Sequence, residues 1–208
     1  MRHDQLFNEK TDRFVLQLDM KERRIPTVQA LLKILAVEPD DLVLDAGVGD
    51  GRFSLALTRF MAEARGRGVV FGCDTSENNV KVTEAALNER GIGQHFYPVE
   101  IDSVKPYQLP FKDEQMDCIL SVDQIPWKIN PLPYLEEYAR VLKPCGTLVV
   151  AESNRRLTME PPRRVSPLPK SDDRRPLLQH AGFDIFSTFD VKNYIWVERA
   201  MKPVLVFS

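Results

Sequence analysis

Three glycines at alternate positions follow an acidic residue in the stretch VLDAGVGDG, which spans residues 43–51. Gly47, Gly49 and Gly51 carry no side chains, so a ligand could lie directly against the backbone there. The apolar residues before Asp45 predict a buried strand that ends at this turn. Because open parallel sheets bind ligands beyond the carboxyl ends of their strands, we expect a binding site here.

A nicotinamide dinucleotide is one candidate ligand for such a turn. Its fingerprint, G-x-G-x-x-G, needs a third small residue, but the third position counted from Gly47 is Arg52. The fingerprint also places an acidic residue about 20 positions later, whereas Asp74 lies 27 positions after Gly47. This spacing argues against a dinucleotide-dependent oxidoreductase. A tight strand-to-helix turn without any ligand stays open at this point.

The elements that would position this turn alternate along the chain. Five short apolar runs predict strands, and they read LVLDA, VVFGCD, HFYPVE, DCILSV and TLVVAE. The first, second and last are nearly continuous in apolar residues, as strands buried on both faces of a parallel sheet are. Between them lie amphipathic helical patterns such as RFSLALTRFM, SENNVKVTEAAL and YLEEYARVL. Ser76 is the predicted N-cap of the second of these helices. The alternation predicts an α/β protein with a doubly wound, mostly parallel sheet.

The two ends of the chain differ from this middle part. Residues 1–38 are expected to form a helical cover, which includes the helix TVQALLKIL after Pro26. Near the other end, GFDIFSTFD and YIWVERAMKPVLVFS are separated only by VKN. So short a link cannot hold a crossover helix, so these two strands should form an antiparallel hairpin. We expect one domain over residues 1–208, with an insert at residues 152–176.

Composition narrows the class of protein. A formal net charge of -2 gives no global field that would attract nucleic acid or an anionic membrane. No apolar run is long enough to span a membrane, and MRHDQLFNEK lacks the apolar region of a signal peptide. The three cysteines have no metal-binding spacing, so we expect a reduced, cytoplasmic setting without a structural metal. A monomer or a homodimer is expected.

The pattern D-x-G-x-G-x-G, preceded by Val43 and Leu44, resembles the nucleoside-binding loop of class I S-adenosylmethionine-dependent methyltransferases. Four further stretches resemble landmarks of that family in the same order, and they are GCDTSENNVKVTEAAL, LPFKDEQMDCILSV, YLEEYARVLKPCGTLVVAE and LLQHAGFDIF. Residues 25–51, together with MEPPRRVSPLPK, most resemble the type 11 subgroup. The resemblance implies a seven-stranded Rossmann-like sheet and S-adenosylmethionine as the cofactor.

The resemblance also implies which residues hold this cofactor. Asp45 and the backbone of Gly47 and Gly49 would hold its methionine portion, since an acidic residue suits the cationic end of the ligand. Asp74, at the end of the second strand, would accept hydrogen bonds from both ribose hydroxyls. In the alternative interpretation, Asp74 only caps the helix that begins near Ser76.

Further polar residues follow the third and fourth strands. Asp102 and Ser103 would face the adenine, and Ser121 would lie beside the sulfonium. Asp123 would lie beside the acceptor, where it could act as a general base, or it could merely cap the following turn. Trp127 could form a wall of the acceptor pocket or simply pack.

In the later sequence, Cys145 departs from the family pattern, and the role of the insert at residues 152–176 stays open. Cys145 stands where the family has the first glycine of KPGG, which would strain that turn if the position needs a positive φ. The insert at residues 152–176 carries a local net charge of +3, so it could prefer an anionic small molecule or be a solvated basic loop. It has no aromatic residues to stack on single-stranded nucleic acid. Its basic residues are Arg155, Arg156, Arg163, Arg164, Lys170, Arg174 and Arg175.

The sequence therefore predicts methyl transfer from S-adenosylmethionine to a small-molecule acceptor. Such a transfer is an in-line displacement, in which the protein mainly aligns the reactants. Two alternatives stay open. One is a catalytically silent, nucleoside-binding regulatory subunit of the same fold, and the other is a methyltransferase that acts on protein or RNA.

Overall fold

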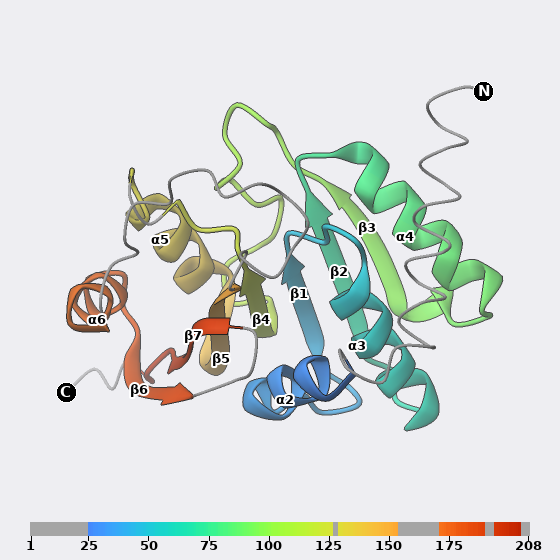
Figure 1. The fold of residues 1–208 in the computed structure, drawn as a ribbon, viewed down its shortest axis with the longest axis horizontal. Helices are drawn as coiled ribbons and strands as arrows, with labels where there is room; N and C mark the ends of the chain where they lie inside the picture. Colours follow the sequence, from blue (N-terminus) through green and yellow to red (C-terminus); the bar gives the residue numbers. More distant parts are fainter. Residues whose placement is uncertain (1–24, 127–128, 154–170, 190–193, 205–208) are drawn as a thin grey trace.

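The computed structural model of the chain describes residues 25–126, 129–153, 171–189 and 194–204. Its centre is a seven-stranded sheet in the order β3-β2-β1-β4-β5-β7-β6 (Figure 1). The strands are β1 (Leu42–Ala46), β2 (Val69–Asp74), β3 (Phe96–Glu100), β4 (Met116–Val122), β5 (Leu142–Ser153), β6 (Asp184–Phe189) and β7 (Tyr194–Met201). β7 is antiparallel to β5 and β6, and the other neighbouring pairs are parallel. The predicted doubly wound sheet with a C-terminal antiparallel hairpin is confirmed.

Helices cover both faces of this sheet (Figure 1). They are α2 (Ile25–Leu35), α3 (Arg52–Glu63), α4 (Glu77–Glu89), α5 (Leu132–Val141) and α6 (Ser171–His180), with a short 3-10 helix η1 (Gly93–His95) before β3. Val43 and Leu44 are neighbours in β1, so their side chains point to opposite faces. Val43 packs with α2 and α3 in one core, and Leu44 packs with α5 and α6 in the other.

The sheet reverses its winding between β1 and β4. The chain runs outward from β1 to β2 and β3, and it then returns to β4 on the other side of β1. In the register of these strands, Ala46 lies opposite Cys73 on β2 and opposite Ser121 on β4. The loops after β1, β2 and β4 therefore leave the same edge side by side. Sheets of this kind bind their ligands at such a reversal.

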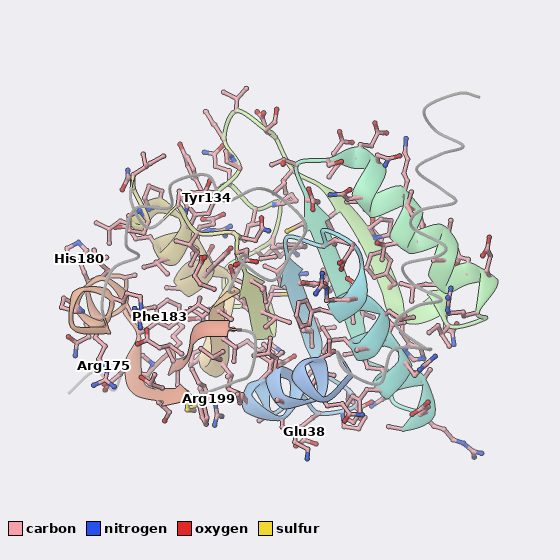
Figure 2. All side chains as sticks on the ribbon, viewed as in Figure 1. Glu38, Tyr134, Arg175, His180, Phe183 and Arg199 are labelled. Atoms are coloured by element: carbon pink, nitrogen blue, oxygen red, sulfur yellow. The ribbon has the colours of Figure 1, made fainter. Side chains whose placement is uncertain are left out.

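Residues 101–115, between β3 and β4, contain no helix. Phe111 instead packs edge-on against Phe71 of β2, with ring centroids 5.3 Å apart. Tyr107 packs in the same manner against Tyr134, with ring centroids 5.9 Å apart. Tyr134 lies near the start of α5 (Figure 2). An extended segment with aromatic anchors thus covers β2 on the face that α5 and α6 cover elsewhere.

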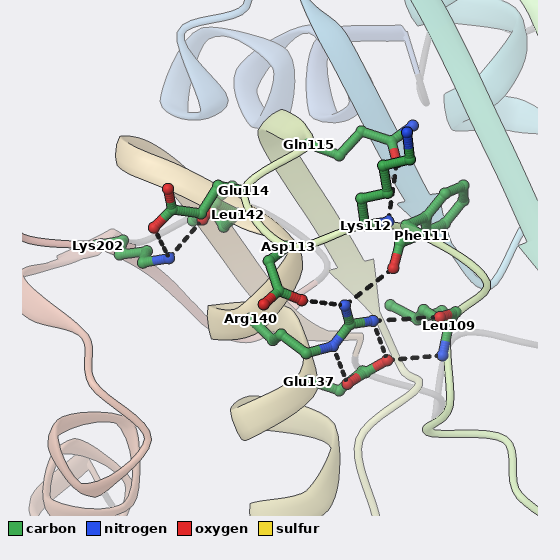
Figure 3. A network of polar contacts seen from close by, with 10 residues as sticks. All are labelled: Leu109, Phe111, Lys112, Asp113, Glu114, Gln115, Glu137, Arg140, Leu142 and Lys202. Atoms are coloured by element: carbon green, nitrogen blue, oxygen red, sulfur yellow. Dashed lines mark hydrogen bonds and ion pairs between the residues drawn. The ribbon is translucent and has the colours of Figure 1, made fainter.

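Arg140 of α5 fastens the end of this segment (Figure 3). Its guanidinium donates to the carbonyl oxygens of Phe111 at 2.9 Å and Leu109 at 3.2 Å. It also forms ion pairs with Asp113 and Glu137, each at 2.7 Å. Burial alone would raise the pKa of Glu137, but hydrogen bonds from Arg140 and from the Leu109 N–H outweigh it and lower the pKa. The network joins residues 109–113 to α5, two stretches that are about 25 residues apart in the chain.

Part of the basic insert is not a surface loop. Arg174 is only 3% exposed, and its Nη2 lies 3.2 Å from Oε1 of Glu198 on β7. Neither interpretation of the insert applies to Arg174, because this buried ion pair holds α6 against the sheet. Arg175, the next residue, is exposed (Figure 2). Residues 154–170 of the insert, residues 1–24 of the expected cover and Trp127 lie outside the described residues.

Cys145 has a left-handed backbone, which glycine adopts without cost. Its φ is 63°, and its N–H donates to the carbonyl oxygen of Lys202 at 2.8 Å. A left-handed conformation costs a residue with a Cβ about 1–2 kcal/mol. The backbone at Cys145, near the start of β5, therefore carries the strain that was expected if this position has a positive φ.

Replacing Arg140 by methionine should destabilise the protein, because two carbonyl oxygens and two carboxylates lose their donor. Hydrogen bonds to charged groups contribute about 1.5–3 kcal/mol each at most, and partial exposure of Arg140 reduces this, so we expect a loss of about 2 kcal/mol in the unfolding free energy. Urea denaturation measures it. Lys81→Met removes only an exposed ion pair with Glu77 on α4 and should leave the midpoint nearly unchanged. Equal midpoints for the parent and Arg140→Met would contradict the role of the network.

Candidate functional site

Three successive backbone N–H groups of the glycine turn are bonded within the protein. Those of Gly47 and Val48 donate to the carbonyl oxygen of Cys73 at 2.8 and 3.0 Å. That of Gly49 donates to Oδ2 of Asp74 at 2.9 Å. These bonds tie the turn after β1 to the end of β2. They also withhold three N–H groups that a phosphate-binding turn would direct at its ligand.

The three glycines meet different surroundings. Their φ values are 96° at Gly47, 54° at Gly49 and 77° at Gly51. A Cβ on Gly47 would collide with the side chain of Gln124, and a Cβ on Gly51 would collide with Thr83 of α4. A Cβ on Gly49 would meet no atom closer than the Gly47 carbonyl oxygen at 3.8 Å. Gly49 therefore faces open space, where a ligand can approach the backbone.

Asp74 closes β2 and organises the loops on either side. Its Oδ2 accepts the Gly49 N–H and, at 3.2 Å, the side-chain amide of Asn79, while Oδ1 accepts the Ser76 N–H at 2.9 Å. Ser76 is the N-cap of α4, as predicted, and its hydroxyl accepts the Asn79 N–H. A carboxylate can accept about four hydrogen bonds, so Asp74 keeps capacity for a ribose hydroxyl. Ribose binding by Asp74 stays a prediction.

Asp45 lies beneath the turn. It is 2% exposed, and its Oδ2 accepts the hydroxyl of Ser54 on α3 at 2.6 Å. Burial raises its pKa to about 7; the hydrogen bond from Ser54 opposes this, and the carboxylates of Asp50 and Asp74 add to it. Direct contact between Asp45 and the methionine portion stays a prediction, because the contacts of this carboxylate in the structure are to Ser54.

Three carboxylates, those of Asp45, Asp50 and Asp74, surround the start of α3. Asp50 accepts the backbone N–H of Arg52, the first residue of α3, at 3.2 Å, and it also forms an ion pair with the Arg52 guanidinium. Protein carboxylates therefore already occupy the positive end of the helix dipole. Arg52 balances the charge of Asp50, so the surplus negative charge is that of Asp74 and of Asp45 in its ionised form, and it attracts a cation and repels a phosphate.

Asp102 and Ser103, the residues predicted to face the adenine, are exposed in the segment after β3. Oδ1 of Asp102 accepts the N–H of Val104 at 2.7 Å, which shapes the start of this segment. The structure places both residues after a strand next to β2, beyond Asp74. Their contact with adenine stays a prediction.

Ser121 and Asp123 end β4 in different environments. Ser121 is 2% exposed, and its hydroxyl lies 3.2 Å from that of Tyr138 on α5, on the opposite face of the sheet from Asp45. Asp123 is half-buried with a φ of 57°, and its N–H donates to the Ala151 carbonyl oxygen at 3.0 Å. Ser121 thus lies below the edge of the sheet, whereas Asp123 lies at it.

A cavity of about 580 Å³ lies between α2 and α3, and its apolar lining includes Leu32, Leu55 and Phe60. It contains none of the residues that the sequence predicts for a site. We place the site at the glycine turn, where open backbone and charged groups gather.

Among the described residues, no cluster of three His, Cys, Asp or Glu could hold a metal, and no described helix is long and apolar enough to span a membrane.

A family model described as a methyltransferase domain matches residues 44–150, just over half of the 208 residues. The chain belongs to this methyltransferase family. The matched range begins within β1 and ends within β5, so it contains the glycine turn, Asp74 and Asp123. The family that the glycine turn and the four further stretches predicted is confirmed.

Relatives with known names support the same assignment. The demethylmenaquinone methyltransferase of Geobacillus kaustophilus is 30% identical over 136 residues, which are 64% of this chain and 53% of that protein. The ubiquinone biosynthesis O-methyltransferase of Parvibaculum lavamentivorans is 30% identical over 124 residues, 59% of this chain and 45% of that protein. The chain thus spans about half the length of these curated relatives. A solved S-adenosylmethionine-dependent methyltransferase from Aquifex aeolicus shares the fold, with a TM-score of 0.70 and 22% identity over 93% of this chain and 97% of that chain.

S-adenosylmethionine is the cofactor of a methyltransferase domain of this family, as predicted. The residues of the site fit it. Gly49 leaves backbone open to a ligand, and Asp45, Asp50 and Asp74 make the surroundings of the turn acidic, which suits a sulfonium and an ammonium group.

Sequence reasoning did not identify three residues that contact this site, which are Ser54, Tyr138 and Gln124. Ser54 and Tyr138 occupy the buried stripes of their helices, and helical periodicity places them there without revealing their hydrogen bonds to Asp45 and Ser121. Gln124 has no local signal at all, because its contact with the glycine turn arises from strand pairing.

Gly49→Leu should abolish binding of S-adenosylhomocysteine while the protein stays folded, because leucine would fill the open space. Leucine in this left-handed backbone costs about 1–2 kcal/mol. Gly91, which follows α4, has a φ of 68°, and a Cβ there would meet nothing within 4 Å. Gly91→Leu therefore carries the same backbone cost and should bind normally. Undiminished affinity of Gly49→Leu in calorimetry would contradict the ligand contact.

The buried Asp45 should make stability fall as the pH rises. Its pKa in the folded state, about 7, exceeds the ordinary value of 3.8, so between these values the folded protein holds a proton that the unfolded chain has lost. The neighbouring Cys73 and Tyr138 stay protonated, because burial raises their pKa further. We expect the unfolding free energy to fall by about 1.4 kcal/mol per pH unit at most within this window.

Asp45→Asn should remove this fall, because the amide does not ionise. Urea denaturation at pH 4.5 to 8 should therefore show the variant gaining stability relative to the parent as the pH rises. The exposed Glu89→Gln on α4 serves as the control and should follow the parent. Parallel curves for Asp45→Asn and the parent would contradict a protonated Asp45 in the folded state.

Proposed function

We propose that this chain transfers a methyl group from S-adenosylmethionine to a small-molecule acceptor by in-line displacement. The acidic glycine turn carries the proposal: the N–H groups of Gly47, Val48 and Gly49 are bonded within the protein, three carboxylates lie around it, and Gly49 is open. These features favour a cationic nucleoside over a phosphate. S-adenosylmethionine supplies a methyl group on a positively charged sulfur that leaves as a neutral thioether.

The loops after β1, β2 and β3 hold the cofactor in this proposal. The Gly47 and Gly49 backbone lies against its methionine portion, Asp74 accepts from a ribose hydroxyl, and Asp102 with Ser103 borders the adenine. Asp45 acts through its charge from below the turn. A cation above it favours the ionised carboxylate, so binding would lower the raised pKa of Asp45.

Asp123 receives a proton from the acceptor in this proposal. It follows β4 at the point where the sheet reverses, and its left-handed backbone is uncommon for a residue with a side chain. Such backbone strain gathers at functional sites. Ser121, buried against Tyr138, supports the same edge from below and does not have to touch the reacting atoms.

The acceptor class is proposed from the relatives. The two relatives described above are named for demethylmenaquinone and for ubiquinone biosynthesis, and they are 30% identical to this chain over the shared part. A phenolic or quinol ring becomes a good nucleophile once it loses a proton, which a carboxylate such as Asp123 can accept. Small quinols are therefore the first acceptors to test.

Calorimetry with S-adenosylmethionine, S-adenosylhomocysteine and NAD tests the binding step. We expect the first two to bind and NAD to fail. Asp74→Asn should weaken S-adenosylhomocysteine binding about tenfold, and it should lose the parent's preference for methylthioadenosine over its 2′-deoxy analogue. Release of S-adenosylhomocysteine in the presence of quinols then tests transfer.

Other outcomes of these measurements separate the rivals. Binding of NAD in place of S-adenosylhomocysteine would overturn the proposal. Cofactor binding without transfer to small molecules, protein or RNA would instead favour a regulatory subunit.

A further inference from the structure

Gln124 lies against the glycine turn from the side of β4. Ser121 and Ala46 are partners in the parallel pairing of β4 with β1, so the residues that follow these strands are neighbours. A Cβ on Gly47 would collide with Cγ, Cδ and Nε2 of Gln124, so the side-chain carboxamide covers the bare backbone of Gly47. Gln124 is itself exposed. Its amide therefore borders both the turn and solvent.

Within the part of the chain that the structure describes, an anion at this turn would find few other donors. The N–H groups of Gly47, Val48 and Gly49 are bonded to Cys73 and Asp74. The Arg52 guanidinium, the cation next to the turn, is held in an ion pair by Asp50.

The carboxylates of the site add a second constraint. Asp74, and Asp45 when it is ionised, attract the ammonium and sulfonium groups of the cofactor and repel its carboxylate, whereas the charge of Asp50 is balanced by Arg52. Asp123, next to Gln124, adds a further acid at this edge. The carboxylate of the cofactor therefore needs a donor that is not already bonded to an acid.

The Gln124 amide has such a donor. Its Nε2 carries two hydrogens, and one hydrogen bond, to the Val122 carbonyl oxygen at 3.2 Å, uses only one of them. We infer that the second N–H of Gln124 binds the carboxylate of the aminoacyl end of the cofactor and makes the site selective for it. The inference rests on the proposed function, because it assumes that the cofactor binds at this turn.

Three ligands together isolate the contribution of the cofactor's carboxylate to binding. They are S-adenosylmethionine, decarboxylated S-adenosylmethionine, which lacks only that group, and adenosine, which lacks the whole aminoacyl end. Gln124→Ala should weaken S-adenosylmethionine about tenfold and leave the other two nearly unchanged. Gln124→Glu should weaken it further and make the decarboxylated form the tighter ligand, because a new negative charge repels one and attracts the other.

Gln115→Glu is the matched control. Gln115 directly precedes β4, at the opposite end of the strand from Gln124, and its Oε1 accepts the Lys112 N–H, which a glutamate can also do. It adds the same charge and should change none of the three affinities by more than about twofold.

The outcomes separate this inference from the function on which it rests. Failure of the parent to bind S-adenosylmethionine would overturn the proposed function itself. Binding by the parent with unchanged affinities in both Gln124 variants would overturn only the role of Gln124. An equal loss for all three ligands would also overturn that role, because it would show an effect on the shape of the turn. Melting temperatures of the variants verify that each is folded.

Discussion

The hydrogen bonds that join the glycine turn to the end of β2 are the constraint on which the rest of the site depends. The Cys73 carbonyl takes two N–H groups from the turn, and the Asp74 carboxylate takes a third. These bonds hold the backbone in the left-handed path that only glycines adopt without cost, and they leave Gly49 facing outward. Because the turn's own donors are used internally, it offers a ligand open space and not a phosphate cradle.

Charge then decides what kind of ligand suits that space. The dipole of α3 would normally attract an anion, but Asp50 already binds the first N–H of the helix and Asp45 is buried at its start. Burying Asp45 next to two other acids raises its pKa to about 7 and disfavours its ionised form. A bound cation relieves this penalty. The proposed binding of a sulfonium at the turn would therefore favour the ionised form of Asp45.

Helix α5 connects this edge to the body of the molecule. Tyr138 reaches under the end of β4 to Ser121, and Arg140, less than one turn away, fastens the segment that carries Asp102 and Ser103 towards the site. The segment has no helix of its own, so its position depends on Arg140 and on the contact of Phe111 with Phe71. One helix therefore supports two walls of the site from the face opposite to α3.

The sequence by itself determined the sheet, the glycine turn and the family. Alternating apolar runs and amphipathic helices reflect burial, which acts through local periodicity, and the three glycines reflect a backbone path that other residues strain to adopt. The N-cap at Ser76 and the positive φ at Cys145 were equally local, and both were predictable. Contacts between separate elements could not be predicted from the sequence.

Only the tertiary structure placed Arg174 in a buried ion pair with Glu198, turned Asp45 towards Ser54 and set Gln124 against Gly47. Arg174 with Glu198 and Gln124 with Gly47 join elements far apart in the chain, and Asp45 meets Ser54, nine residues later, only through the packing of α3 on β1. Such partners depend on strand register and helix packing, which no short stretch of sequence encodes.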